Sequence, residues 1–211
     1  MMLKGFTLPQ NKTSAGHRIP SIHIAAQDDK LRRFFQAAQD GKIRDFKALL
    51  PDQNINSRDT DNNTALHWAT QNAKINIAQF LINQGAELNF QNIRHNTVLH
   101  LAVLNNNLGI VQLLLKSNAA LTIKNESQRT PFEIAFIKLE SYLNSQRPYD
   151  ETIFDSQPVK NYLDIIIAFT GNPIAMRRYN EKAYWIIKEH QHDPKTLFRN
   201  LSQLFSPFLP T

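Results

Sequence analysis

The stretch Thr64-Ala65-Leu66-His67-Trp68-Ala69 returns twice further along the chain. It recurs as Thr-Val-Leu-His-Leu-Ala at residues 97–102 and as Thr-Pro-Phe-Glu-Ile-Ala at residues 130–135, so each copy begins 33 residues after the one before it. A fixed period of this length indicates a stacked array, in which each unit buries one face against its neighbours. The sequence therefore predicts that Leu66, Leu99 and Phe132 occupy equivalent inward positions on successive layers.

The rest of each period supports a pair of helices per repeat. Behind the first copy, Ile77, Phe80 and Leu81 form an apolar stripe with the i, i+3, i+4 spacing of a helix face. Gly85 follows at the point where a helix commonly ends with a left-handed residue. Asn118 stands at the same place one repeat later, and Asn is the next-best residue at positive φ. Each repeat is therefore predicted to be two short helices closed by a left-handed turn.

These residues resemble the ankyrin repeat, which has a turn, a Thr-Pro-Leu-His-x-Ala helix, a second helix ending in Leu-Leu and a Gly-Ala-Asp-Val-Asn exit. The resemblance covers about residues 28–137 and is closest in the two middle repeats. It implies an all-α fold, an ankyrin-repeat solenoid of about four helix-pair repeats with a helical C-terminal cap. The implied domain, 28–170, divides into repeats at about 28–58, 59–91, 92–124 and 125–170, the last with a long loop at 145–157. For function, the resemblance implies a binding scaffold without naming its partner.

The turn before each first helix departs from the family pattern. A glycine usually precedes the Thr-Pro-Leu-His segment, whereas Asn62, His95 and Gln128 hold that place here. Asn tolerates positive φ better than most residues, but His or Gln there incurs strain of about 1 kcal/mol. These turns are therefore expected to be looser than those of the family. Asp59 and Asp61, which flank the first turn, are expected to cap it rather than to form a catalytic carboxylate pair.

The two ends of the chain do not match the repeat. Residues 1–27 are predicted to be a flexible basic leader, because the first 20 residues carry three basic side chains and no acidic one. Residues 171–211 are predicted to be a helical extension that covers the open end of the array. One of its helices is expected between Met176 and Ile187, and another is expected to begin at Asp193-Pro194. A separate peptide or membrane-surface helix formed by residues 195–209 is the alternative.

The composition and motifs exclude several classes of chemistry. The chain has no cysteine, which rules out disulfides, thiolate metal sites and a cysteine nucleophile. It also lacks a glycine-rich phosphate loop and the hydrolase, zinc-protease and kinase signatures. His67 and His100 recur at one repeat position, where the family uses the ring to hydrogen-bond neighbouring turns, so a structural role is expected rather than a metal site. The sequence therefore predicts no enzyme activity, no cofactor and no metal.

Charge and hydropathy bear on the partners and the compartment. The net charge of +6 and the pI of about 9.6 favour polyanions at long range, but no dense run of Lys and Arg occurs, so nucleic-acid binding is not expected. No stretch is long and apolar enough for a transmembrane helix, and the N-terminal residues lack the apolar core of a secretory signal peptide. The absence of cysteine fits a reducing cytosol. We expect a cytoplasmic monomer that binds a protein.

Ankyrin repeats offer their partners a concave face made of turn tips and first helices. The resemblance carries this partner-binding face onto Thr60, Asp61, Asn63, Gln71 and Asn72 in the second repeat, Ile93, Arg94, Asn96, Leu104 and Asn105 in the third, and Glu126, Ser127, Arg129, Ile137 and Lys138 in the fourth. Ile93, Leu104 and Ile137 are apolar at positions that are expected to face solvent, and contact with solvent does not favour apolar side chains there. With Arg94 and Arg129 beside them, they are expected to form an apolar centre with a charged rim. Burial of one or two of them by the long loop of the fourth repeat is the alternative.

Three functional hypotheses follow from these patterns. The first is a non-enzymatic adaptor that binds a protein through the concave face, and the second places the function in the C-terminal helical region, 145–211, which the repeats position. The third, an enzyme built on the array, lacks a catalytic constellation. Trp68 is expected to fill the core rather than to anchor a partner. The Asn- and Ile-rich, cysteine-free sequence is similar to ankyrin-repeat effectors that intracellular bacteria deliver into host cells by a non-Sec route, which implies a host protein as the partner.

Overall fold

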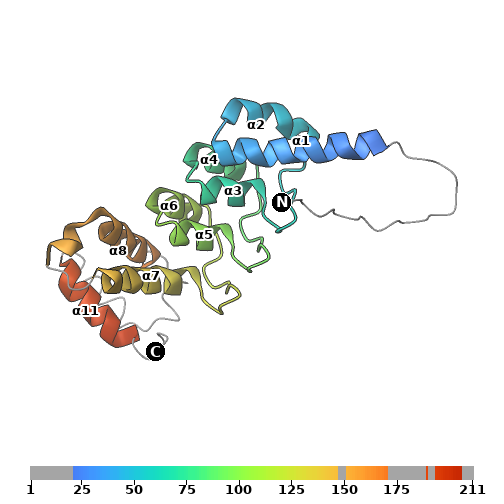
Figure 1. The fold of residues 1–211 in the computed structure, drawn as a ribbon. Coiled ribbons are helices and arrows are strands. Elements are labelled where there is room, and N and C mark those ends of the chain that lie inside the picture. The colour runs from blue at the N-terminus through green and yellow to red at the C-terminus, as the bar shows by residue number, and fades with distance from the viewer. Residues whose placement is uncertain (1–20, 147–150, 171–188, 190–192, 206–211) are drawn as a thin grey trace, which may run out of the picture.

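The structure is a computed structural model that describes residues 21–146, 151–170, 189 and 193–205. Its helices follow one another as stacked pairs (Figure 1). In chain order they are α1 (Ser21–Asp40), α2 (Ile43–Leu49), α3 (Ala65–Gln71), α4 (Ile75–Asn83), α5 (Val98–Leu104), α6 (Leu108–Lys116), α7 (Pro131–Ser145), α8 (Gln157–Thr170) and α11 (Pro194–Phe205), with the short 3-10 helices η1 (Leu50–Asp52) and η2 (Glu151–Asp155). The described ranges contain no β-strand, and the predicted all-α fold is confirmed.

The pairs stack into two layers of helices. The first helices of successive pairs, α1, α3, α5 and α7, pack against one another in order, and α4, α6 and α8 form the second layer beside them. Leu66 and Leu99 are fully buried and Phe132 is 2% exposed, each on the first helix of its own layer. Full burial of such a side chain stabilises the fold by about 1.5 to 3 kcal/mol. The predicted equivalence of these three positions is therefore confirmed.

A threonine begins the first helix of each of the three quoted repeats. The hydroxyl oxygen of Thr64 accepts a hydrogen bond from the backbone N–H of His67, and the backbone N–H of Thr64 donates to Nδ1 of the His67 ring (N···N 3.2 Å). Thr97 and His100 repeat this reciprocal arrangement (N···N 3.1 Å). It satisfies backbone donors that a helix start otherwise leaves without a partner. Threonine therefore caps these helix starts, with histidine in the place usually held by Glu or Gln.

The turns ahead of these helices are regular, contrary to the expectation of looseness. Asn62, His95 and Gln128 all adopt the left-handed conformation, with φ of 59°, 56° and 58°. Each backbone N–H donates to the carbonyl oxygen of the residue three positions earlier, at 3.0, 2.8 and 2.8 Å in that order. The sequence located the strained positions correctly, but the strain does not open the turns.

Glycine at the strained positions is expected to stabilise the array. His95→Gly and Gln128→Gly should each raise the free energy of unfolding by about 0.5 to 1 kcal/mol, because glycine takes positive φ without a steric penalty. Asn62→Gly is the matched control and should change it by only a few tenths of a kcal/mol, because Asn tolerates this conformation. Equilibrium urea unfolding measures all three. Destabilisation of both His95→Gly and Gln128→Gly would contradict the expectation.

Helix α1 corrects the predicted boundary of the N-terminal leader. The helix begins at Ser21, inside the segment 1–27 that was predicted to be flexible, and runs to Asp40. It continues this far because residues 21–40 contain neither glycine nor proline. Gly41, at φ 81°, then ends the helix in the left-handed conformation. Residues 1–20 lie outside the described residues.

The fourth repeat is completed by α8, within the range 125–170 that was predicted for it. Helix α8 packs against both α7 and α6, which is the place of a second helix in the earlier repeats. The predicted loop at 145–157 is less irregular than expected, since Glu151–Asp155 form η2 and α8 begins at Gln157. Pro158 suits the first turn of α8, where a missing N–H costs no hydrogen bond.

The C-terminal helix α11 begins where the Asp193-Pro194 pair predicted. The Oδ1 atom of Asp193 accepts from the backbone N–H of Thr196 (3.2 Å), which caps the helix start. Leu197 and Leu201 are fully buried in the common hydrophobic core, and α11 contacts η2. The burial of these two leucines is what a cap predicts and what a detached surface helix does not. The helix expected between Met176 and Ile187 and the end of the chain, 206–211, lie outside the described residues.

Candidate protein-binding surface

The turn tips of the second, third and fourth repeats are joined by backbone hydrogen bonds. The N–H of Ile93 donates to the carbonyl oxygen of Asp61 (3.0 Å), and the N–H of Glu126 donates to that of Arg94 (3.1 Å). Each bond links a tip to the tip of the preceding repeat, so the three tips form one continuous edge. A surface that is held in place before binding loses less conformational entropy on binding.

Asparagine side chains add a second set of links between the same turns. The amide nitrogen of Asn92 donates to Oδ1 of Asn63 (3.0 Å), and that of Asn125 donates to Oδ1 of Asn96 (3.1 Å). Within each turn, Oδ1 of Asn92 also accepts from the backbone N–H of Asn96 (3.1 Å), just as Oδ1 of Asp59 accepts from that of Asn63 (2.8 Å). The expected turn-capping role of Asp59 is thus confirmed, and Asn92 takes the same role one repeat later.

The two repeated histidines lie beneath these turns and are fully buried. In His67, Nε2 lies 3.3 Å from the carbonyl oxygen of Asn96 in the next repeat, and in His100 it lies 3.1 Å from that of Arg129. Because each Nδ1 accepts from a threonine N–H, the neutral ring carries its proton on Nε2 and donates it to the carbonyl. Burial lowers the pKa of His67 to about 4 and also lowers the pKa of His100. The expected structural role is confirmed.

A groove lies between the second and third repeats, with a volume of about 340 Å³. We call it the inter-repeat groove, and its lining residues are Asp61, Asn63, Trp68, Gln71, Asn92, Ile93, Arg94, Asn96, Leu101, Leu104 and Asn105. Eight of them belong to the predicted partner-binding face, and Trp68, Asn92 and Leu101 were not part of that prediction. Leu101 follows the buried Leu99 by two positions, and helical spacing alone does not distinguish a groove wall from the core there.

The rest of the predicted face does not line this groove. It consists of Thr60, Asn72, Glu126, Ser127, Arg129, Ile137 and Lys138. Asn72 ends α3, where its side-chain amide donates to the carbonyl oxygen of Trp68 (2.9 Å). Ile137 is half-buried on α7, in the fourth repeat. Of the three residues predicted to form an apolar centre, only Ile93 and Leu104 line this groove. Ile93 is 54% exposed and Leu104 is half-buried.

Trp68 packs against the hydrophobic core, as expected, but it is only partly buried there. Its side chain is half-buried, and its indole Nε1–H donates to Oδ2 of Asp59 (2.8 Å). Oδ1 of the same carboxylate accepts from the backbone N–H of Asp61 and of Asn63, at 2.9 and 2.8 Å. The polar edge of the indole is thus tied to the turn, and the ring forms part of the surface. A buried indole needs a partner for its N–H, and here Asp59 supplies that partner at the surface.

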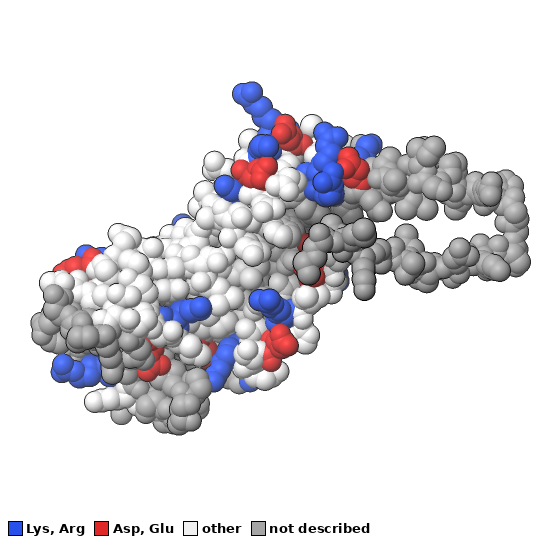
Figure 2. Space-filling model, viewed as in Figure 1, with Lys and Arg blue, Asp and Glu red and all other residues white. Residues whose placement is uncertain are grey.

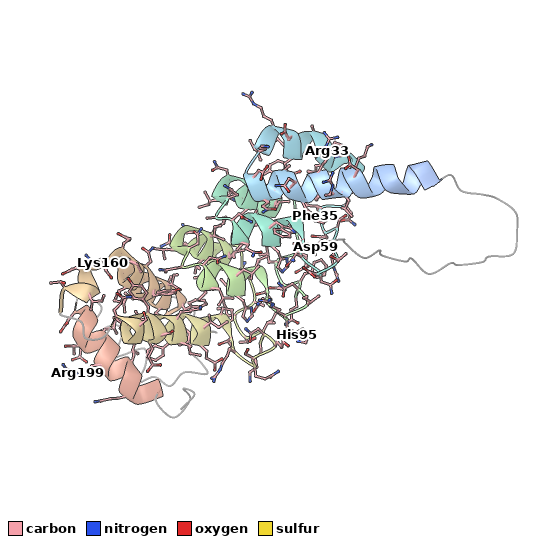
Figure 3. The ribbon with its side chains drawn as sticks, viewed as in Figure 1. Arg33, Phe35, Asp59, His95, Lys160 and Arg199 are labelled. Atoms are coloured by element: carbon pink, nitrogen blue, oxygen red, sulfur yellow. The ribbon has the colours of Figure 1, made fainter. Side chains whose placement is uncertain are left out.

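Trp68 also lines a second groove, which we call the α1 groove, with a volume of about 490 Å³. It lies between α1 and the start of the second repeat, and its lining residues are Leu31, Arg32, Phe35, Gln36, Gln39, Arg58, Asp59, Thr60 and Trp68. Figure 3 shows Phe35 on α1 near Asp59 on the adjoining loop. Sequence reasoning missed this site, although Leu31 and Phe35 stand at i, i+4 on one face of α1.

On the face shown in Figure 2, the charged side chains of the described residues do not form one basic patch. Figure 2 shows Lys and Arg with Asp and Glu beside them over α1 and near the turns, and a largely uncharged band between. The groups of His, Asp and Glu among the described residues include none that is arranged to hold a metal ion. In the same part of the chain, no helix combines the length and the apolar character needed to cross a bilayer.

Comparison with known proteins agrees with the repeated helix pairs. Residues 34–125 match the family model for ankyrin repeats, in three copies. This part of the chain is an ankyrin-repeat array. The chain is also similar to the palmitoyltransferase AKR1 of Saccharomyces cerevisiae, with 30% identity over 91 residues. That match covers 41% of this chain and only 12% of the yeast protein, so the likeness is confined to a small part of the relative.

Proposed function

We propose that the chain is a non-enzymatic adaptor that binds a partner protein through the inter-repeat groove and the ankyrin turn tips beside it. The observation that carries the proposal is the exposure of Ile93, at 54%, on a tip that is hydrogen-bonded to its neighbours. Ile93 lies in one groove lining with Leu104 and Trp68, and an apolar group of this kind with polar side chains around it is typical of a protein-interaction site. Arg94 and Asp61 stand beside it, which gives the apolar centre a charged rim.

The size and lining of the groove favour a protein segment over a cofactor. At about 340 Å³ the groove is at the small end of the range of about 300 to 1,000 Å³ that is typical of small-molecule sites. Amide side chains and two half-buried apolar residues, Trp68 and Leu104, line much of it. These groups suit the side chains of a loop or an extended peptide, with hydrogen bonds around one or two apolar anchors.

The identity and setting of the partner are finer proposals. We infer a cytosolic setting and a monomeric adaptor from the cysteine-free sequence and the single array. The similarity in composition to delivered bacterial effectors supports a host protein as the partner. Nucleic acid is a weaker candidate, because the net charge of +6 is spread along the chain.

Alanine at Ile93, Arg94 and Leu104 together is expected to weaken partner binding by about 100-fold, because central anchors dominate interface energetics. A photocrosslinking residue at Ile93 in the full chain identifies the partner from a eukaryotic lysate by mass spectrometry. The matched control places the same residue at Gln79, which is exposed on α4 in the second layer. The affinity of the identified partner is then measured by titration calorimetry. Unchanged affinity in a triple variant that keeps its helical circular dichroism would refute this surface.

The C-terminal region, 145–211, remains the alternative site of function. Truncation there confounds function with folding, since Leu197 and Leu201 are buried in the common core. A surface change avoids this problem, and Arg199 is exposed on α11 (Figure 3). Loss of partner binding in Arg199→Glu, together with normal binding by the triple variant, would favour the C-terminal site over the inter-repeat groove.

A further inference from the structure

The α1 groove offers an apolar floor that the described residues do not cover. Leu31 and Phe35 approach from α1, and the ring of Trp68 closes the groove from α3. Leu31 and Trp68 are half-buried and Phe35 is 8% exposed, so the floor is part of the packed structure. Packed aromatic side chains at the bottom of a groove are the usual anchors of a protein interface.

The charged groups around this floor are two arginines, Arg32 and Arg58, and one carboxylate, Asp59, so the lining carries a formal net charge of +1. Asp59 is the one carboxylate in the lining, and its two oxygens accept from two backbone N–H groups and from the indole of Trp68. Arg58 lies with its guanidinium carbon 4.0 Å from the centre of the Phe90 ring and belongs to none of the ion pairs that the described residues form. Arg32 pairs with Asp29 at 2.6 Å in an exposed ion pair, and such pairs are weak enough to exchange for another carboxylate.

Two kinds of segment could occupy this groove: residues 1–20 of the same chain, or a segment of a partner protein. Their charge distinguishes them. Residues 1–20 end where α1 begins, about 15 Å along the helix from Leu31, and an extended chain of this length reaches about 66 Å. Those residues contain Lys4, Lys12 and Arg18 and no acidic residue, so two arginines in the groove repel them. An acidic segment meets the same arginines favourably.

We propose that the α1 groove binds an acidic peptide segment of the partner, with an apolar side chain on Leu31, Phe35 and Trp68 and a carboxylate on Arg58. The guanidinium of Arg58 keeps its N–H edges for a carboxylate while its flat face stacks on Phe90. This inference rests on the proposed function only in that the partner is a protein. Trp68 lines both grooves, so one partner segment spans them.

The test uses the fluorescence of Trp68 in the full chain carrying Trp185→Phe, which leaves one tryptophan. The probes are a short peptide of glutamates flanking leucine and phenylalanine, the same peptide with lysine for every glutamate, and a synthetic copy of residues 1–20. We expect a saturable, salt-sensitive change with the glutamate peptide and affinity at least about tenfold weaker for the other two. Equal affinity for the lysine peptide or for the N-terminal copy would overturn the proposal.

Charge-reversal variants locate the site and keep the test independent of the inter-repeat groove. Arg58→Glu should weaken the glutamate peptide at least about tenfold, and Arg32→Glu, on the exposed side of α1, is a second variant with less risk to folding. Lys116→Glu makes the same change of charge on the exposed end of α6 and should alter the affinity less than about twofold. If Lys116→Glu weakens the affinity for the glutamate peptide as much as Arg58→Glu does, binding depends only on the net charge of the protein, and the proposed site is wrong. The alanine variant at Ile93, Arg94 and Leu104 reports separately on the proposed function.

Discussion

Leu99→Ala is expected to lower the free energy of unfolding by about 3 to 4 kcal/mol, a large part of the stability of a small domain. Leu99 is fully buried. It lies on α5, which packs between α3 and α7. Removing its branched end creates a cavity in a core that has neighbours on both sides and little freedom to collapse. Because each repeat is stabilised by its interfaces, damage in the third repeat weakens two of them at once.

Equilibrium urea unfolding followed by far-UV circular dichroism measures this change. The control is Ile93→Ala in the same repeat, where 54% exposure predicts a change of less than about 0.5 kcal/mol. If Leu99→Ala does not fold, Leu99→Met keeps most of the volume and should cost less than about 1.5 kcal/mol. A Leu99→Ala protein as stable as the Ile93→Ala control would contradict the stacked-layer packing.

The features that sequence predicted well are those that each repeat specifies locally. Thr64 and His67 are three residues apart and close their own cap, so their pairing needs no tertiary information. Leu66 and Leu99 face inward because a fixed period places them on equivalent layers. The left-handed conformation of Gly85 and Asn118 followed from the repeat as well, because both stand where a helix ends, whereas that of Ala73 and Asn106 was not predicted.

The expectation of loose turns is wrong because hydrogen bonds within and between the turns outweigh the backbone strain. A left-handed His95 costs about 1 to 2 kcal/mol. Against this, the same turn makes a backbone bond from His95 to Asn92, a link from Ile93 to Asp61 and an amide link from Asn92 to Asn63. Each such bond contributes about 1 kcal/mol, and breaking them would leave partly buried polar groups without partners. The bonds between repeats therefore hold the turn closed.

The candidate site was only partly predictable, because it depends on how the repeats lie against one another. Repeat position correctly placed Ile93 and Leu104 on one groove but also proposed Ile137, which sits a full repeat away. The partly exposed Trp68 donates a hydrogen bond to Asp59, nine residues earlier, and the period alone does not reveal that bond. The α1 groove depends on where an unusually long first helix lies against the second repeat. Local patterns carry no information of that kind.

Acidification from pH 6.5 to about 4 is expected to lower the free energy of unfolding by about 3 kcal/mol through His67 alone. Burial lowers the pKa of this ring from 6.5 to about 4, and each pKa unit is worth about 1.4 kcal/mol. Between these two values the unfolded chain holds a proton on the ring and the native state does not, so stability falls as the pH falls. Above about pH 7.5 the ring is neutral in both states, and this contribution no longer changes.

Protonation also breaks the geometry that joins two repeats. Nδ1 of His67 accepts from the N–H of Thr64, and a proton on Nδ1 would replace that hydrogen bond with two opposed donors. The ring is fully buried, so the charge would have no water to solvate it. His100 adds to the effect in the same direction, because burial lowers its pKa as well.

Urea unfolding of the wild type and of His67→Gln between pH 7.5 and 4.5 tests this expectation. The variant should be less stable at pH 7.5, because the link to Asn96 is weakened, and its stability should fall less steeply as the pH is lowered. Asp29 and Asp40 do not confound the comparison. Hydrogen bonds from Arg32 and Lys42 lower the pKa of these carboxyls below 3.8, so their contributions are lost at more acidic pH. If the free energy of unfolding depends on pH in the same way in both proteins, the pKa of His67 does not differ between the folded and unfolded states, and the expectation is wrong.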